Sequence, residues 1–168
     1  YTWGYIEGIQ VRPAREIIHK LIAVVSKNGQ MLLNLSPRAD GIIPAEQQAV
    51  VHEVGRWLWS FGQAIYGTRP FAVAGETTAD GHVVAYTRRG STLYAIIQGW
   101  PGAGRTLRLR ELNASHLAGQ TVASATLLGL KQLEPCTLQA GADGVTVTLP
   151  ADAREPSPHA CVIRLELQ

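Results

Sequence analysis

The sequence predicts an α/β part followed by an all-β part. Residues 1–70 contain two helix patterns separated by a short, nearly continuous apolar run, an order typical of α/β folds with a parallel sheet. Residues 71–168 contain short runs of alternating apolar and polar residues separated by turn residues. This second pattern predicts an antiparallel β-sandwich or a related β domain. We therefore expect two domains, with the boundary near residue 70.

Pro13 begins the first predicted helix, because proline is favoured at the first helical position. After it, apolar residues recur at steps of three and four, as expected for one face of a helix. They are Ile17, Ile18, Leu21, Ile22, Val24 and Val25. Asn28 and Gly29 form a stop signal. The pattern predicts a helix over residues 13–28.

Residues 31–36 form the apolar run, and their pattern predicts a strand that is covered on both faces. Pro44 then begins a second predicted helix over residues 45–61. Trp57 belongs to the apolar face of this helix, whereas Trp59 lies off that face, where it can meet the β domain. One strand and two helices cannot close a sheet, so we expect this half to be a piece of something larger.

In the second half, the alternating runs predict six strands. They cover residues 82–88, 92–98, 106–110, 121–128, 145–149 and 160–167. Turn residues separate them, for example at 142–144. Residues 63–70 contain Gly67 and Pro70 and predict a linker between the two halves.

Composition excludes several classes of protein. The 168 residues are 46% hydrophobic and carry a formal net charge of +2, with Lys and Arg scattered along the chain. A scattered charge predicts no nucleic-acid partner. No apolar run approaches the ~20 residues of a spanning helix, so we expect no membrane span. A complete (β/α)₈ barrel needs ~250 residues and does not fit.

Cys136 and Cys161 have no Cys or His neighbour at the spacing of metal ligands, so we expect no metal and no cofactor. Two alternatives remain open for them. They form a disulfide if the compartment is oxidising, or they are two separate buried thiols.

Several blocks of the first half resemble the end of the catalytic domain of the α-L-fucosidases, family 29 of the glycoside hydrolases. Trp3-Gly4-Tyr5 is similar to a Ser-Trp-Gly-Tyr signature, with Thr2 in place of the serine. Further blocks follow in the same order as in the family, at residues 25–29, 32–41, 43–44, 55–58 and 61–70. The resemblance is strong over residues 1–70 and weaker in the β half, where residues 94–101 are similar to a family segment that ends in Trp-Pro.

This resemblance implies the last helix-strand-helix portion of a (β/α)₈-like barrel followed by an antiparallel β-sandwich. It implies retaining hydrolysis of terminal α-L-fucosyl linkages, through an Asp nucleophile and a carboxylic general acid/base that both lie upstream of this chain. The expected partners are a fucosylated oligosaccharide or glycoconjugate, and the upstream catalytic portion of the same enzyme or further copies of the chain. The family also implies a periplasmic, extracellular or lysosome-like location. The apolar, aromatic start of the chain agrees with an upstream segment.

Retaining hydrolysis needs two carboxyl groups about 5 Å apart. The first half offers five, which are Glu7, Glu16, Asp40, Glu46 and Glu53. Three belong to predicted outer helix faces, Asp40 belongs to a turn, and Glu7 alone follows the Trp-Gly-Tyr block. We therefore expect no catalytic residue in this chain and no activity from the chain alone.

An alternative function is a non-catalytic carbohydrate-binding or interaction module. Trp100, Pro101, Tyr86 and Tyr94 could then form a sugar platform, or they pack inside the β domain. A free module has no use for a lone strand that is covered on both faces, which favours the fucosidase interpretation.

Two residues are candidates for contact with a sugar. Trp3 offers a flat aromatic face that suits the apolar face of a sugar ring, and in the family the aromatic at this position lines the fucose pocket. Asn34 lies at the carboxyl end of the predicted barrel strand, where barrel enzymes build their active sites. Both residues also have a purely structural interpretation, in core packing for Trp3 and in loop hydrogen bonding for Asn34. Arg38 is a weaker candidate, and we assign no role to the five histidines.

Overall fold

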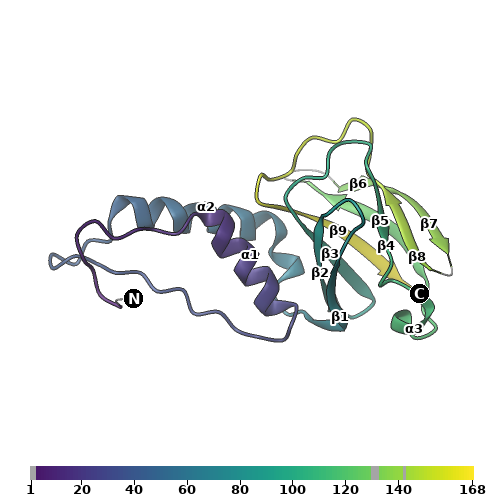
Figure 1. Ribbon diagram of the computed structural model, residues 1–168, viewed down its shortest axis with the longest axis horizontal. Helices are drawn as coiled ribbons and strands as arrows, with labels where there is room; N and C mark the ends of the chain where they lie inside the picture. Colours follow the sequence, from purple (N-terminus) through teal and green to yellow (C-terminus); the bar gives the residue numbers. More distant parts are fainter. Residues whose placement is uncertain (1–2, 130–132, 142) are drawn as a thin grey trace.

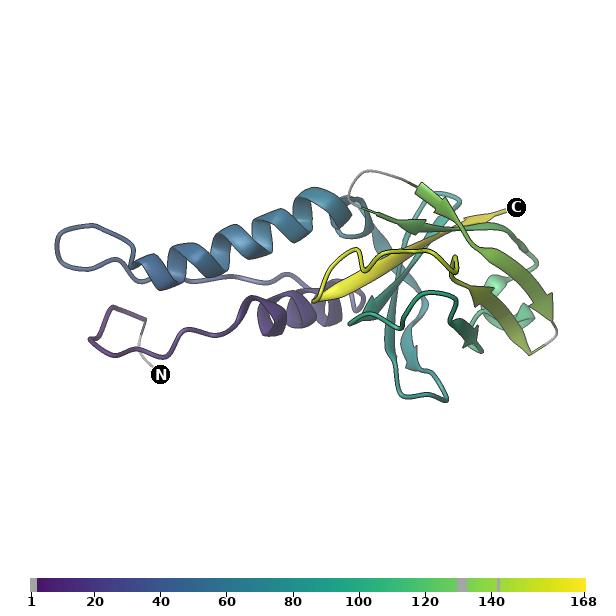
Figure 2. The ribbon, with the colours of Figure 1, turned by 90° about the horizontal axis from the view of Figure 1, so that it is seen from above.

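The computed structural model describes residues 3–129, 133–141 and 143–168. Thr2 of the predicted signature and Ala142 of the predicted turn lie outside the described residues. Two helices and their connecting segments project from one side of a β structure built from two sheets (Figures 1 and 2). Among the described residues, none of the helices combines the length and apolar character that a bilayer crossing requires.

The two predicted helices are present as α1 (Ala14–Val25) and α2 (Ala45–Phe61), the second continued by a 3₁₀ turn, η1 (Gly62–Ala64). Pro13 and Pro44 lie one residue before α1 and α2, where their missing N–H costs no helical hydrogen bond. α1 ends three residues earlier than predicted. Asn28 adopts the left-handed conformation (φ 63°) and the Gly29 N–H donates to Val24 O (2.8 Å), which closes the helix end.

The β structure consists of a six-stranded sheet in the order β1-β2-β3-β9-β5-β6 and a three-stranded sheet in the order β4-β8-β7, and every ladder is antiparallel. The strands of the larger sheet are β1 (Arg69–Thr77), β2 (Val83–Arg89), β3 (Thr92–Gln98), β9 (Ala160–Leu167), β5 (Val122–Leu128) and β6 (Leu133–Pro135). Those of the smaller sheet are β4 (Thr106–Leu109), β8 (Gly144–Thr148) and β7 (Thr137–Gly141), and a short helix, α3 (Ala114–Leu117), follows β4.

All six predicted strands are present, and β1, β6 and β7 are additional. The predicted linker over residues 63–70 is shorter than expected, because η1 and β1 take up its two ends and leave a turn over residues 65–68. β1 escaped the pattern because it contains Pro70 and Gly75, residues that ordinarily interrupt strands. Both fit here, since the register of β1 against β2 shifts between Pro70 and Gly75, as in a β-bulge.

Each face of the larger sheet packs against its own apolar core. One core lies between the two sheets and contains Tyr86, Leu93, Leu107 and Val147. The other lies between the two helices and the opposite face of the larger sheet, at β2, β3, β5 and β9. It contains Ile18, Ile22, Trp57, Phe61, Tyr94, Ile96, Ala160 and Val162. The expected alternation is therefore absent from β3 and β9, where consecutive residues are buried because helices cover the face that would otherwise meet water.

The strand predicted at residues 31–36 is wrong for this chain. The segment is extended and runs beside α2 toward the loop that precedes that helix (Figure 2), but no ladder among the described residues includes it. Leu32 is 85% exposed and Leu33 is 41% exposed, so the expected burial on both faces is also absent. A strand requires a neighbour to receive its peptide hydrogen bonds, and the described residues place none beside this segment.

The junction between α2 and β9 depends on Trp57. Its indole Nε1–H donates to Ala160 O (3.0 Å), and its ring is 3% exposed against Phe61. The prediction that Trp57 belongs to the core is confirmed. The interpretation of Trp59 as the residue that meets the β domain is wrong, because Trp59 is 92% exposed on the opposite side of the helix.

Two further contacts tie the helices to the residues just before β9. His159 O accepts a hydrogen bond from His19 Nε2 of α1 (2.7 Å), and His159 Nε2 lies 2.8 Å from Glu53 Oε1 of α2. The helices and the larger sheet are thus joined by polar contacts as well as by the apolar core.

These contacts predict that substitution of Trp57 destabilises the protein, whereas substitution of Trp59 does not. Trp57→Phe removes the donor to Ala160 O and leaves a buried carbonyl unpaired, so we expect unfolding free energy to fall by about 1–3 kcal/mol. Trp59→Phe is the matched control and should change it by less than about 0.5 kcal/mol. Urea unfolding monitored by circular dichroism measures both. Equal losses for the two variants would contradict the assignment of Trp57 as the junction residue.

Candidate functional site

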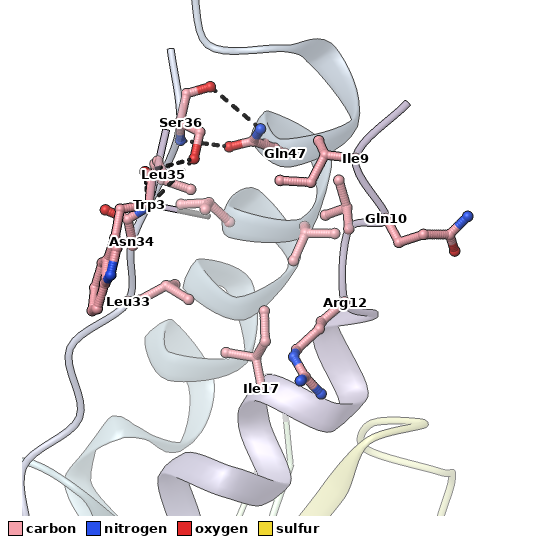
Figure 3. Close-up of a pocket in the computed structure, with 13 residues that line it drawn as sticks. Trp3, Ile9, Gln10, Arg12, Ile17, Leu33, Asn34, Leu35, Ser36 and Gln47 are labelled. Carbon is pink, nitrogen blue, oxygen red and sulfur yellow. Dashed lines mark hydrogen bonds between the residues drawn. The ribbon is translucent and has the colours of Figure 1, made fainter. Parts of the chain in front are cut away.

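The structure brings together the two residues predicted to contact a sugar. Asn34 Nδ2–H donates to Trp3 O (3.1 Å), and the Ser36 hydroxyl donates to the same carbonyl (3.3 Å). Segments 31 residues apart in sequence are therefore held side by side. The Trp3 side chain itself is 79% exposed. In Figure 3 it lies with Asn34 on the side of the extended segment that faces away from the helices.

A cavity of about 450 Å³ lies between this extended segment, residues 9–12, and the helices α1 and α2 (Figure 3). Most of its lining is aliphatic: Ile9, Val11, Ile17, Leu33, Leu35, Val50 and Val51. None of the thirteen residues that line it in the described chain is an acid. Such a lining suits apolar side chains and offers no carboxyl group for sugar hydrolysis.

The buried side-chain amide of Gln47 lies at the polar end of the cavity, beside Ser36. Gln47, in the first turn of α2, is 6% exposed and accepts a hydrogen bond from the Ser36 N–H at Oε1 (2.9 Å). Its Nε2–H donates to Ser36 O (3.4 Å). We did not predict this residue from the sequence. The available signal was its place in the apolar stripe of α2, three, four and seven residues before Val50, Val51 and Val54.

The carboxyl groups of the first half are dispersed, and most have structural partners. Glu16 pairs with Arg12 (3.3 Å) and Glu53 with His159 (2.8 Å). Asp40 accepts the Ile42 N–H (3.0 Å) and pairs with Arg38 (2.7 Å), and these two interactions lower the pKa of its carboxyl group. Arg38, the weaker sugar candidate, is thus held in its own loop.

Glu7 and Glu46 are exposed. Like the paired carboxylates, neither of them lines the cavity next to Trp3.

The aromatic residues of the β half do not form a platform. Tyr86 is fully buried between the two sheets, whereas Tyr94 is buried on the opposite face of the larger sheet, under the helices. Trp100 packs against the core between the sheets. The interpretation of these residues as packing is therefore confirmed, and the feature that favoured an independent sugar-binding module is absent.

The described residues contain no group of three or more His, Cys, Asp or Glu side chains that could hold a metal ion. Cys136 and Cys161 are both free thiols in the structure; Cys161 is buried, whereas Cys136 is half-buried, so the alternative of two buried thiols fits Cys161 fully and Cys136 in part. Burial raises the pKa of the Cys161 thiol to about 12 and that of Cys136 to about 11.

Comparison with known proteins identifies both halves. Residues 1–63 match the family of alpha-L-fucosidases, and residues 77–166 match the alpha-L-fucosidase C-terminal domain. This chain belongs to the alpha-L-fucosidase family. The predicted fold class, an end portion of the catalytic barrel followed by a β-sandwich, is confirmed. The exception is the segment over residues 31–36, which is extended but pairs with no strand among the described residues.

Individual alpha-L-fucosidases match almost the whole chain. The tissue alpha-L-fucosidase of Bos taurus is 32% identical over 169 residues, which cover 98% of this chain and 34% of the relative. The chain thus spans about a third of the length of that relative. A Thermotoga maritima alpha-fucosidase, solved in complex with fucose, is 26% identical with a TM-score of 0.82, over 97% of this chain and 36% of that one.

A third member comes from Bacteroides thetaiotaomicron and was solved as a trapped covalent intermediate with 2-fluoro-fucosyl fluoride. It is 27% identical with a TM-score of 0.76, and the match covers 99% of this chain and 36% of that one. The fucosidase-family chain described here therefore shares its fold with enzymes that form a covalent intermediate.

The raised thiol pKa values predict that both cysteines react slowly with thiol reagents in the folded protein. The thiolate is the reactive form, so at about pH 8 the folded protein should react with a disulfide reagent such as DTNB far more slowly than a free thiol does. In denaturant both thiols should react at once, giving two equivalents per chain. Rapid reaction of either thiol in the folded protein would contradict the burial described here.

Proposed function

We propose that this chain forms the last part of the catalytic barrel and the C-terminal β-sandwich of a retaining α-L-fucosidase that hydrolyses terminal α-L-fucosyl linkages of glycoconjugates. Residues 1–70 belong to the barrel and residues 71–168 to the sandwich in this proposal. The observation that carries it is the extended segment over residues 31–36, which has an apolar side chain on either face and no ladder in the described chain.

In the proposed enzyme, this segment is a barrel strand flanked by strands from the upstream catalytic portion. Their apolar side chains fill the cavity between the segment and the helices, whose aliphatic lining fits such occupants. Leu32, which is 85% exposed here, is covered at the same time. Each Å² of apolar surface that is buried in this way stabilises the assembled enzyme by roughly 25 cal/mol.

The same assembly assigns roles to the sugar-facing residues. Trp3 and Asn34 form one wall of the fucose pocket, on the side of the segment opposite the helices. The nucleophile and the general acid/base come from the upstream portion, because the carboxylates of residues 1–70 are dispersed or engaged in structural pairs. The chain therefore shapes the pocket and supports the barrel, and the chemistry takes place on residues it does not contain.

A chimera tests the proposal. In it, this chain replaces the corresponding C-terminal part of the Thermotoga maritima fucosidase. We expect the chain alone to release no nitrophenol from 4-nitrophenyl α-L-fucoside, and the chimera to hydrolyse it. The matched control is the chimera with Glu7→Gln, which should keep its activity. Turnover by the chain alone that disappears on Glu7→Gln, or a folded chimera without activity, would overturn the proposal.

Exposed apolar side chains predict association of the unjoined chain. Eight lie in residues 1–70, and they are Trp3, Tyr5, Ile6, Leu32, Leu33, Ile42, Trp59 and Tyr66. Exposed apolar side chains in such number favour contact with another chain. We expect light scattering to give a mass above that of a single chain, and the double variant Leu32→Lys, Leu33→Lys to lower it. A strictly monomeric chain at high concentration would contradict this interpretation of the surface.

A further inference from the structure

The side chain of Gln47 bonds to the extended segment as a neighbouring strand would. Its amide carries one acceptor and one donor, and these engage the N–H (2.9 Å) and the carbonyl (3.4 Å) of a single residue, Ser36. A residue of an adjacent antiparallel strand offers the same pair of groups, its own carbonyl and its own N–H. Gln47 is 6% exposed and Ser36 is 5% exposed, so both partners lose hydrogen bonds to water when they pack together.

The helix that carries Gln47 is fixed at a distance from this contact. Trp57 and Glu53, further along α2, bind Ala160 and His159 of the β half. Gln47 therefore extends from a helix that is anchored on the larger sheet, and it holds the segment at its last predicted strand residue. Its exposed neighbour Gln48 donates instead to Ile43 O (2.7 Å) and does not contact the segment.

Ser36, which Gln47 holds, is in turn hydrogen-bonded to the backbone of Trp3. The Ser36 hydroxyl donates to Trp3 O (3.3 Å), and Asn34 Nδ2 contacts both that carbonyl (3.1 Å) and the Ser36 hydroxyl (3.3 Å). The three groups form one connected set (Figure 3). A displacement of Ser36 therefore moves the two donors that hold the backbone of Trp3.

We propose that Gln47 is a positioning residue for the sugar-binding wall. It fixes Ser36, and through Ser36 and Asn34 it sets the place of Trp3. The proposal rests on the proposed function for the statement that Trp3 contacts the fucosyl group. Gln47 itself touches neither the sugar nor the reacting atoms, and it acts by reducing the number of arrangements open to Trp3 before substrate binds.

The first experiment uses the chain as it stands. Gln47→Met keeps the length of the side chain and removes both hydrogen bonds, and Gln48→Met is the matched control. Amide hydrogen exchange by NMR should show the Ser36 N–H protected in the parent and in Gln48→Met, with at least a tenfold loss of protection in Gln47→Met. The indole N–H signal of Trp3 should shift in Gln47→Met only.

A second, conservative variant at the same position distinguishes loss of the hydrogen bond from misfolding of the protein. Gln47→Glu keeps an acceptor for the Ser36 N–H and loses the donor to Ser36 O, so it should retain most of the Ser36 protection. Unchanged Ser36 protection in folded Gln47→Met would overturn the proposal, as would an unchanged Trp3 signal. If Gln47→Met does not fold, loss of Ser36 protection in folded Gln47→Glu overturns it instead, and retained protection supports it.

The second experiment separates this proposal from the proposed function. In the active chimera, Gln47→Met should raise KM for the aryl fucoside about tenfold with little change in kcat, because a misplaced binding wall weakens substrate and transition state alike. Gln48→Met should leave both constants unchanged. An unaltered KM for Gln47→Met would overturn the proposal. An inactive parent chimera would count against the proposed function alone, and the exchange and indole measurements would still decide whether Gln47 positions Trp3.

Discussion

The packing of α1 and α2 on one face of the six-stranded sheet is the constraint on which the remaining structure depends. It buries Tyr94 and Ile96 of β3 and Ala160 and Val162 of β9, and it includes the Trp57 indole, which donates a hydrogen bond to Ala160 O. Because α2 is held there, its first turn has a defined place, and Gln47 can reach Ser36. The β half therefore supports the two helices, and α2 in turn holds the extended segment at Ser36.

The same arrangement explains why the first half looks unfinished. α1 and α2 have partners on the sheet, whereas the extended segment is held within the described chain by the Gln47 side chain, by its contacts with Trp3 and by the packing of Met31 on the core under the helices, and not by a ladder. Its side chains meet an aliphatic cavity on one face and solvent on the other. The relatives that match the chain are about three times as long, and in the proposed enzyme the upstream portion covers this segment.

Local patterns in the sequence predicted most of the elements. Both helices follow from the spacing of their apolar residues and from Pro13 and Pro44, and the burial of Trp57 follows from its place in the stripe. Features set by distant segments could not be predicted. Alternation fails in β3 because helices from elsewhere cover its second face, and the role of Gln47 was missed because an amide on a helix is ordinarily solvated. Trp3 and Asn34 were predicted separately as sugar contacts and are hydrogen-bonded neighbours in the structure, while their contact with a sugar stays a prediction.

The central position of β9 has a consequence for the order of folding. This strand lies between β3 and β5, and it provides the carbonyl for Trp57, which is 103 residues earlier in the chain. During synthesis on the ribosome, α1 and α2 emerge long before their docking surface exists, and the nascent apolar stripes stay uncovered until β9 arrives. Contacts of such long sequence separation make folding slow. Chaperone binding to the two helices would shield them during that interval.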